Sequence, residues 1–353
     1  MQILETFIAA LIGSTIFYFI KIPLPWMLGS LSAVLLWNGY TKRKIVWPKG
    51  IWYTGLIVVG YTIGSTFTQD TARTIMVQLP VMTLVTVITI FFNLMMGYLT
   101  YCKTDISLAS GLMGSIPGGL SQIAALCTEI EDADLTVVTF MQTARALSVV
   151  FVVPFLAING LGGSFGGASS MIPNALVPMP DISWENGLLL TAIPLSGYLA
   201  KRLHVPTPYL LGPVIGTACF GLAGFTIPPL PRTWTNIAQL CIGTYTGARM
   251  NMEELKSCKQ LVPFTITSLT GLLLLSLGIG WLLNYYFNIP LITAFLSTAP
   301  GGIAEMSLTA IQVHADLSII VAFQLFRLLF ILIIVPPVLK WWLIREKVKE
   351  KLV

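Results

Sequence analysis

The sequence predicts an all-α, polytopic membrane protein of about 10–12 transmembrane helices, built from two related halves. The 353-residue chain is 55% hydrophobic and 10% charged, with a mean hydropathy of +0.82, whereas a soluble chain carries about 25% charged residues. A Pro-Gly-Gly triplet also occurs twice, at 117–119 and 300–302, each time inside apolar sequence. Proline and glycine break helices. In a bilayer such breaks are tolerated only where the freed backbone groups face protein or a water-filled cavity.

The first half consists of apolar segments separated by short turns. We expect helices at 3–20, 26–37, 51–68 and 79–101. A broken helix follows at about 106–127, and a final long helix runs from the stretch after 134 to about Ile158. Lys21–Pro25 predicts a tight turn, and a polar turn with Asp70 and Arg73 is expected before the 79–101 helix. Asp134 stands directly before the last helix and is expected to cap it.

The second half repeats the first at a nearly constant offset. The offset is 183 residues up to the second Pro-Gly-Gly triplet and 182 after a one-residue gap. Matched pairs are Pro23 and Pro206, Gly60 and Gly243, Asp134 and Asp316, Gln142 and Gln324, and Arg145 and Arg327. A run of matches in register indicates a tandem duplication. We therefore predict a first membrane repeat at 1–158, a Gly-, Ser- and Pro-rich linker or lid at 159–184, a second repeat at 185–344 and a basic cytoplasmic tail at 345–353.

Loop charge bears on how the two halves are oriented, because Lys and Arg collect on the cytoplasmic side. With five crossings per half, most cations lie on the side of the N-terminus, in the loop 42–49 and in the C-terminal tail. Only Lys21, Arg73 and Arg232 lie on the other side. Six crossings per half would make the repeats parallel and spread the charge more evenly. The charge distribution therefore favours inverted repeats with cytoplasmic termini.

The two breaks are the predicted binding site. Half-helices present their ends to the membrane midplane, where N-terminal N–H groups suit anions and C-terminal carbonyls suit cations. Candidate binding residues in and around the breaks are Ser115, Pro117, Gly118, Gly119, Ser121, Gln122, Ser297, Thr298, Pro300, Gly301, Gly302 and Glu305. The alternative is that each Pro-Gly-Gly triplet is merely a loop at the membrane surface.

Glu305 is the strongest single candidate for a coupling residue. Its repeat partner is the neutral Gln122, so the halves differ by one titratable group beside the break. A carboxylate within a membrane protein is expensive and by default a functional candidate. Glu305 is therefore expected to couple transport to a proton or a cation, unless it lies near the interface or only pairs with an arginine.

Two further pairs, Gln142 with Arg145 and Gln324 with Arg327, lie on the helices that follow the breaks. Residues three apart share one face of a helix, and a buried guanidinium needs a partner. One interpretation is a clamp for a substrate carboxylate or phosphate, which arginine suits. The other is structural, with each arginine donating to broken-helix carbonyls or to Glu305.

The sequence gives no sign of an enzyme, a cofactor or a metal site. The five cysteines are scattered without a CxxC motif, and the two histidines, His204 and His314, lie in different halves, whereas copper and iron oxygenases need clustered ligands. The expected partners are the lipid bilayer and a small-molecule or ion substrate, without nucleic acid, and a homodimer remains an option.

The duplicated motifs P-x-P-x-x-L-G, at 23–29 and 206–212, and S/T-x-P-G-G, at 115–119 and 298–302, resemble those of the AbrB-type membrane protein family. The resemblance covers essentially the whole chain. Members are described as transporters or membrane regulators, and some carry the label ammonia monooxygenase. The family looks related to the cation:proton antiporters and anion symporters. That relation implies inverted repeats, discontinuous helices that cross at the membrane centre, and an elevator-like motion of a core against a scaffold.

The sequence and this resemblance together lead to one functional expectation. The chain is expected to be a multi-pass protein of the plasma membrane, of the bacterial inner-membrane type, that carries a small solute such as an organic anion with H⁺ or Na⁺. The alternative is a membrane regulator of gene expression without flux. The absence of an appended soluble domain in the sequence disfavours that alternative, and a duplicated broken-helix core disfavours an ion channel.

Overall fold

The computed structural model describes residues 2–41, 47–117, 127, 132–161, 184–225, 227–250 and 259–350, and within these ranges every regular element is a helix. Five of the described helices are long and apolar enough to cross a membrane. The crossing stretches are Gln2–Phe19, Arg73–Lys103, Leu135–Leu161, Val262–Phe287 and Leu317–Leu339. The predicted all-α, polytopic membrane protein is thereby confirmed.

The helices follow the predicted order. Those of the first half are α1 (Gln2–Phe19), α2 (Pro25–Thr41), α3 (Lys49–Gly64), α4 (Gln69–Lys103), α5 (Leu108–Ser115) and α7 (Leu135–Phe155), which a π-helical turn extends over Leu156–Leu161. Those of the second half are α8 (Trp184–Arg202), α9 (Pro208–Leu222), α10 (Arg232–Arg249), α12 (Val262–Phe287), α13 (Leu291–Thr298), α14 (Ile303–Gln312) and α15 (Leu317–Glu350), with a short 3₁₀ turn at Lys259–Leu261 before α12.

The prediction of a polar turn around Asp70 and Arg73 is wrong. Helix α4 begins at Gln69, so Asp70 and Arg73 lie in its first turns, and the Thr68 hydroxyl caps it by accepting from the Thr71 N–H at 3.2 Å. Most of the predicted 159–184 linker falls outside the described residues. Helix α15 continues through residues 345–350, the first part of the predicted tail.

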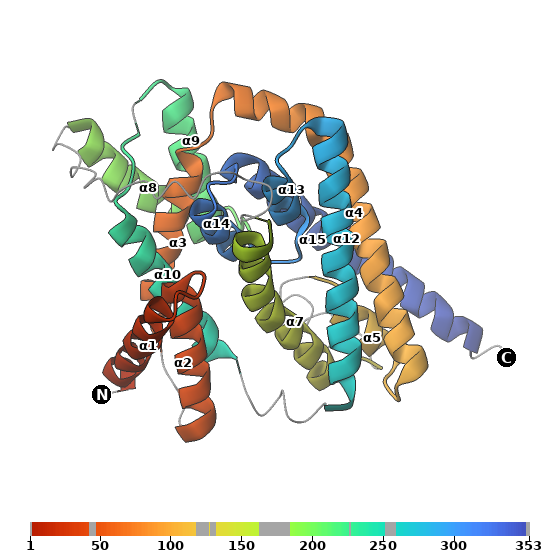
Figure 1. The fold of residues 1–353 in the computed structure, drawn as a ribbon. Coiled ribbons are helices and arrows are strands. Elements are labelled where there is room, and N and C mark those ends of the chain that lie inside the picture. The colour runs from red at the N-terminus through yellow and green to blue at the C-terminus, as the bar shows by residue number, and fades with distance from the viewer. Residues whose placement is uncertain are drawn as a thin grey trace.

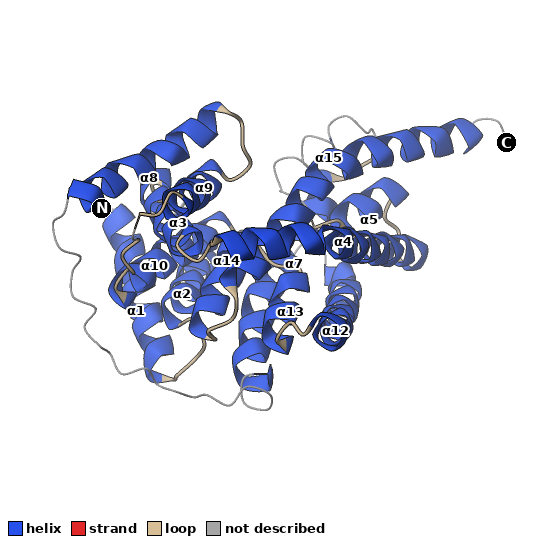
Figure 2. Cartoon of the chain, turned by 90° about the horizontal axis from the view of Figure 1, so that it is seen from above, coloured by secondary structure: helices blue, strands red, loops and turns tan. Residues whose placement is uncertain are grey.

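The helices form two groups that lie side by side in both views (Figures 1 and 2). The glycine-packed group contains α1, α2, α3, α8, α9 and α10, which pack mainly on one another. The broken-helix group contains α4, α5, α7, α12, α13, α14 and α15. Helix α3 contacts both α14 and α15 and so connects the two groups.

Close helix crossings in the glycine-packed group recur at the sequence offset of 183. A β-carbon on Gly60 of α3 would lie 2.5 Å from the Leu210 carbonyl oxygen of α9. A β-carbon on Gly243 of α10 would lie 2.2 Å from the Met27 carbonyl oxygen of α2. Each pair occupies matched positions, so a helix of either half packs on a helix of the other. Such backbone contact requires glycine.

The turns before α2 and α9 also match. Lys21 and Leu24 have φ of 60° and 46°, and His204 and Thr207, 183 residues later, have φ of 55° and 45°. Left-handed backbone is uncommon for residues other than glycine. Its recurrence at matched positions is expected of two halves with a common design, whereas their orientation across the membrane stays a prediction.

These crossings give a first testable prediction. Gly243→Ala is expected to lower the stability of the protein by about 1–3 kcal/mol, because the new methyl group forces α2 and α10 apart. Gly278→Ala in α12 is the matched control, because a β-carbon there meets nothing within 4 Å and alanine favours the helix by about 0.5–1 kcal/mol. The apparent melting temperatures in detergent would show the difference. Equal melting of the two variants would contradict the close crossing.

Candidate functional site at the broken helices

Each predicted break ends a short helix inside the broken-helix group. Helix α5 ends at Ser115 and Ile116 turns to an extended conformation, with φ −71° and ψ 128°. Helix α13 ends at Thr298 and Ala299 does the same, with φ −58° and ψ 141°. In the second half, α14 then begins after Gly302. Four of the candidates, Gly118, Gly119, Ser121 and Gln122, lie outside the described residues.

The end of α13 is held by side chains from α15. Gln324 Nε2 donates to the carbonyl oxygens of Leu296 at 2.8 Å and Ala299 at 3.0 Å. Arg327 Nη1 donates to Thr298 O at 3.2 Å and Ala299 O at 2.8 Å, and its Nη2 donates to Gly301 O at 3.0 Å. Arg327 Nη2 also donates to Gln324 Oε1. The α13 carbonyls therefore receive buried donors in place of water.

The end of α5 is held in the same way by α7. Gln142 Nε2 donates to Met113 O at 3.1 Å and Ile116 O at 2.7 Å. Arg145 donates to Ser115 O at 2.8 Å, to Ile116 O at 3.3 Å and to Gln142 Oε1 at 2.6 Å. Met113, Ser115 and Ile116 match Leu296, Thr298 and Ala299 at the offset of 183. The same cap therefore serves both half-helices.

These bonds show that the two arginines have the structural role considered from the sequence, which is donation to the carbonyl oxygens of the broken helices. A helix C-terminus carries partial negative charge, which a guanidinium neutralises. A guanidinium has five N–H donors, and Arg327 directs four of them to backbone and Gln324 oxygens. Arg145 directs three to such acceptors. The additional role of an anion clamp stays a prediction, and Arg145 retains more donor capacity for it.

The hydroxyl groups around the breaks donate to nearby backbone. Ser115 Oγ donates to Leu112 O at 2.8 Å and Ser297 Oγ donates to Thr293 O at 2.7 Å. Thr298 Oγ1 reaches the Ser276 carbonyl of α12 at 3.0 Å, and Ser276 Oγ donates to Thr298 O at 3.2 Å. A hydroxyl whose proton is engaged presents lone pairs, so these groups can accept from a ligand.

Ser276 is a residue that the sequence interpretation missed. It ties α12 to the end of α13, and its matched position in the first half is the buried Asn93 of α4. Two polar residues at matched positions of long apolar helices were a usable signal. The predicted N-cap is confirmed, since Asp134 Oδ1 accepts from Thr136 N at 2.7 Å. Asp316, its matched residue, caps α15 in the same way, and its Oδ1 accepts from Ser318 N at 3.0 Å.

Glu305 lies in the first turn of α14 and its carboxylate folds back toward the break. Gly302 is the N-cap of this helix, and a β-carbon on Gly302 would lie 2.1 Å from Glu305 Oε2. The carboxylate therefore occupies the space that a side chain at 302 would fill. A carboxylate in the first turn of a helix is stabilised by the free N–H groups and the macrodipole.

The charged groups near the breaks form a small set. Helix α14 packs against α3, α7, α13 and α15. The charged side chains that these helices bring to the breaks are Arg145, which binds the end of α5, and Arg327, which binds the end of α13. Arg327 is only 8% exposed. Among the described residues, two guanidinium groups, one carboxylate and the ends of three half-helices thus share this region.

The sequence is similar to a known protein family and to known proteins over most of its length. A family model described as "Transition state regulatory protein AbrB" matches residues 26–343. The "Putative regulator AbrB" of Escherichia coli (strain K12) is 24% identical over 336 residues, which are 95% of this chain and 94% of that protein. The "Uncharacterized protein YhjN" of Bacillus subtilis (strain 168) is 27% identical over 262 residues, 71% of this chain and 68% of that protein.

Proposed function

Because the chain belongs to the AbrB family of membrane proteins, we propose that it carries a small organic anion across the plasma membrane, coupled to H⁺ or Na⁺. The observation that carries this proposal is the break between α13 and α14. Two half-helix ends lie there beside Glu305, the candidate coupling group. Paired discontinuous helices are the usual place of solute and ion sites in secondary transporters.

The charges at the break suggest how solute and cation would be coupled. With Glu305 ionised, its carboxylate occupies the α14 N-terminus, which is the natural anion site of the break. Protonation or Na⁺ binding neutralises that carboxylate and leaves the charge of Arg145 and Arg327 and the N–H groups of α14 to an incoming anion. The anion and the cation then enter together, because each favours binding of the other.

The two helix groups suggest which parts would move. We expect the broken-helix group to move as the transporting body against the glycine-packed group. The polar contacts that link them include Leu24 N to Gln312 Oε1 at 3.0 Å, and the Thr66 and Ser318 hydroxyls at 2.8 Å. Hydrogen bonds of this kind each contribute about 1 kcal/mol, so they can be exchanged during a transport cycle.

Flux measurements test the proposal. The full chain would be reconstituted into proteoliposomes and supplied with a panel of radiolabelled mono- and dicarboxylates under an imposed pH or Na⁺ gradient. We expect uptake of at least one anion above that of protein-free vesicles, and its collapse when the gradient is dissipated. Gradient-independent leakage for the whole panel would reject coupled transport.

A regulatory role without flux is the second candidate, favoured by the word "regulator" in the printed name of the E. coli relative. The two functions separate in a strain that lacks the gene. If a variant without measurable flux restores the transcript levels of the wild type, the protein regulates without transporting. If only flux-competent variants restore them, any regulation follows from transport.

Gly302 provides a prediction at the coupling group itself. Gly302→Ala is expected to lower coupled uptake several-fold, because the new methyl group displaces the Glu305 carboxylate from the α14 N-terminus. Gly301→Ala is the matched control, since a β-carbon there meets the flexible Met306 side chain, with Cε at 2.2 Å, and not Glu305. Uptake by the two variants, normalised to the amount of folded protein, is the measurement. Equal loss in both would contradict a specific role for the space at 302.

A further inference from the structure

The carbonyl oxygens at the end of α13 are the backbone groups at which a metal cation would bind. In secondary transporters, unwound carbonyls and the C-terminal ends of half-helices coordinate Na⁺. Here those oxygens already have a cationic partner. Thr298 O and Ala299 O accept from Arg327 at 3.2 and 2.8 Å, and Gly301 O accepts from it at 3.0 Å. A guanidinium therefore occupies the place of a bound cation at this break.

The end of α5 is occupied in the same way. Ser115 O and Ile116 O accept from Arg145 at 2.8 and 3.3 Å, and Gln142 Nε2 donates to Met113 O and Ile116 O. A guanidinium is not deprotonated in proteins, so it repels a second cation that approaches the same oxygens. Displacing the arginine instead would leave its charge unpaired within the membrane, which is unfavourable. Both half-helix C-termini are thus poor sites for Na⁺.

Glu305 lies at the opposite kind of helix end. Gly302 is the N-cap of α14, and in the first backbone bond of this helix Met306 N donates to Gly302 O at 3.0 Å. The N–H groups of residues 303–305 precede that bond, so the backbone groups of the first turn are donors and not acceptors. This end of a helix carries partial positive charge and favours anions. It stabilises the carboxylate but supplies no oxygen ligands to a metal cation.

The hydroxyl groups near this break are neutral and bound to helix backbone. Thr298 Oγ1 lies 3.0 Å from the Ser276 carbonyl oxygen, Ser276 Oγ donates to Thr298 O at 3.2 Å, and both residues are 2% exposed. Ser307 Oγ donates to Ile303 O at 2.6 Å within α14. Among the described residues of the break, Glu305 is therefore the one anionic group available to a cation.

We propose that the coupling ion is a proton and that the site discriminates against Na⁺. This inference rests on the proposed function and specifies the ion that the proposed function leaves open. A proton needs one oxygen atom and no shell of ligands. It forms one O–H bond with the Glu305 carboxylate on the side of loading and returns to water on the side of release. Glu305 is partly exposed and Gly302 beside it is exposed, so water reaches the carboxylate.

The other charged groups around α14 do not exchange protons in this scheme. Of the helices packed against it, α13 carries no charged residue, α7 carries Arg145 and α15 carries Arg327 at the breaks. The remaining charges of these helices are Lys49, at the first residue of α3, and those of residues 340–350, in the last turns of α15. Glu305 is therefore the titrating group of the break.

Proteoliposomes that contain the full chain separate the two ions. Radiolabelled mono- and dicarboxylates would be supplied under an inward H⁺ gradient in Na⁺-free choline buffer, and separately under an inward Na⁺ gradient at equal pH with a protonophore. We expect the H⁺ gradient alone to give the full gradient-driven uptake, and the Na⁺ gradient to give none above the level without a gradient. Uptake driven by Na⁺ alone would overturn the inference and support the proposed transport. No uptake under either gradient would reject the proposed function, and the inference with it.

Binding of radioactive Na⁺ to the purified full chain tests the inference without flux. The wild type and Glu305→Gln would be compared in a mild detergent over a range of Na⁺ concentrations at constant ionic strength. We expect the two proteins to bind Na⁺ equally, because the wild-type carboxylate holds no metal cation. Saturable Na⁺ binding that Glu305→Gln removes would overturn the inference.

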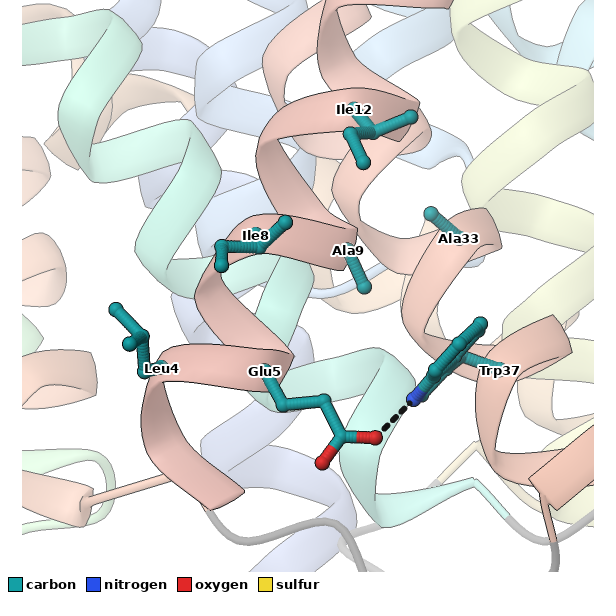
Figure 3. Close-up of a pocket in the computed structure, with 7 residues that line it drawn as sticks. All are labelled: Leu4, Glu5, Ile8, Ala9, Ile12, Ala33 and Trp37. Atoms are coloured by element: carbon teal, nitrogen blue, oxygen red, sulfur yellow. Dashed lines mark hydrogen bonds between the residues drawn. The ribbon is translucent and has the colours of Figure 1, made fainter. Parts of the chain in front are cut away.

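Glu5→Gln is the matched control for the flux measurement. Glu5 is a carboxylate of the spanning stretch Gln2–Phe19, in the glycine-packed group. Among its partners is Trp37, whose Nε1 donates to Glu5 Oε1 at 3.0 Å beside a groove between α1 and α2 (Figure 3), and glutamine retains an acceptor oxygen there. We expect Glu5→Gln to keep the response to the H⁺ gradient and Glu305→Gln to lose it. Loss of the response in both variants, or in neither, would overturn the assignment of the proton to Glu305.

Discussion

Replacing Glu305 with glutamine is expected to remove the response of anion uptake to the pH or Na⁺ gradient and to lower coupled uptake at least tenfold. Glutamine is neutral at every pH and Na⁺ concentration, so the neutralisation that is proposed to admit the anion can no longer depend on the gradient. Glutamine has the shape of the protonated side chain and is the residue that the first half carries at the matched position, Gln122. The helix packing should therefore be preserved.

The measurement is anion uptake by Glu305→Gln at a series of external pH values and Na⁺ concentrations. Thermal melting in detergent would verify the fold, and Asp105→Asn serves as the control for loss of a carboxylate elsewhere in the chain. The charged groups on the helices around α14 that could also affect the profile are Arg145 on α7 and Arg327 on α15. A variant whose gradient response equals that of the wild type would exclude Glu305 as the coupling group.

Replacing Arg327 with methionine is expected to destabilise the protein by about 3–5 kcal/mol. Methionine preserves much of the side-chain volume but none of the donors, and each buried oxygen that is left without a donor costs about 1–3 kcal/mol. The carbonyls of Thr298, Ala299 and Gly301 and the amide oxygen of Gln324 would all lose a donor. The apparent melting temperature in detergent is the direct measurement.

Two further variants make the Arg327 result specific. Arg145→Met removes the matched cap of α5 and is expected to destabilise less, because Arg145 makes fewer bonds and is more exposed. Arg202→Met changes an exposed arginine whose described partner is Tyr198, and surface pairs contribute about 0–1 kcal/mol. If Arg327→Met and Arg202→Met have the same apparent melting temperature, Arg327 does not stabilise the end of α13.

The main features of the fold follow from the sequence because they depend on local chemistry. A Pro-Gly-Gly triplet cannot continue a helix, so the ends of α5 and α13 could be predicted. The register of the two halves also predicted that Gln142 with Arg145 and Gln324 with Arg327 would have equivalent roles. The capping role of Asp134 and Asp316 required only that each residue precede a helix.

Other features depend on neighbours that are distant in the sequence. The two roles considered for Arg327 differ only in which oxygen atoms lie within its reach, and those belong to a helix end 26–29 residues away. The space reserved for the Glu305 carboxylate at Gly302 arises from a side-chain rotamer that no pattern encodes. The start of α4 was predictable in principle, because Thr68 before Gln69 and Asp70 is a capping signal, but its charges suggested a turn.

The exchange of helices between the halves has a consequence for biosynthesis. Helix α3 packs through Gly60 on Leu210 of α9, and these residues are separated by 150 positions (210 − 60) in the chain. At roughly 5–20 residues per second, α3 enters the bilayer on the order of 10 s before α9 has been synthesised. The Gly60 side of α3 therefore contacts lipid until α9 is inserted. Insertion of this helix thus precedes its packing on the second half. Ribosome-bound chains that end before α9 are expected to remain open to proteases that the finished protein resists.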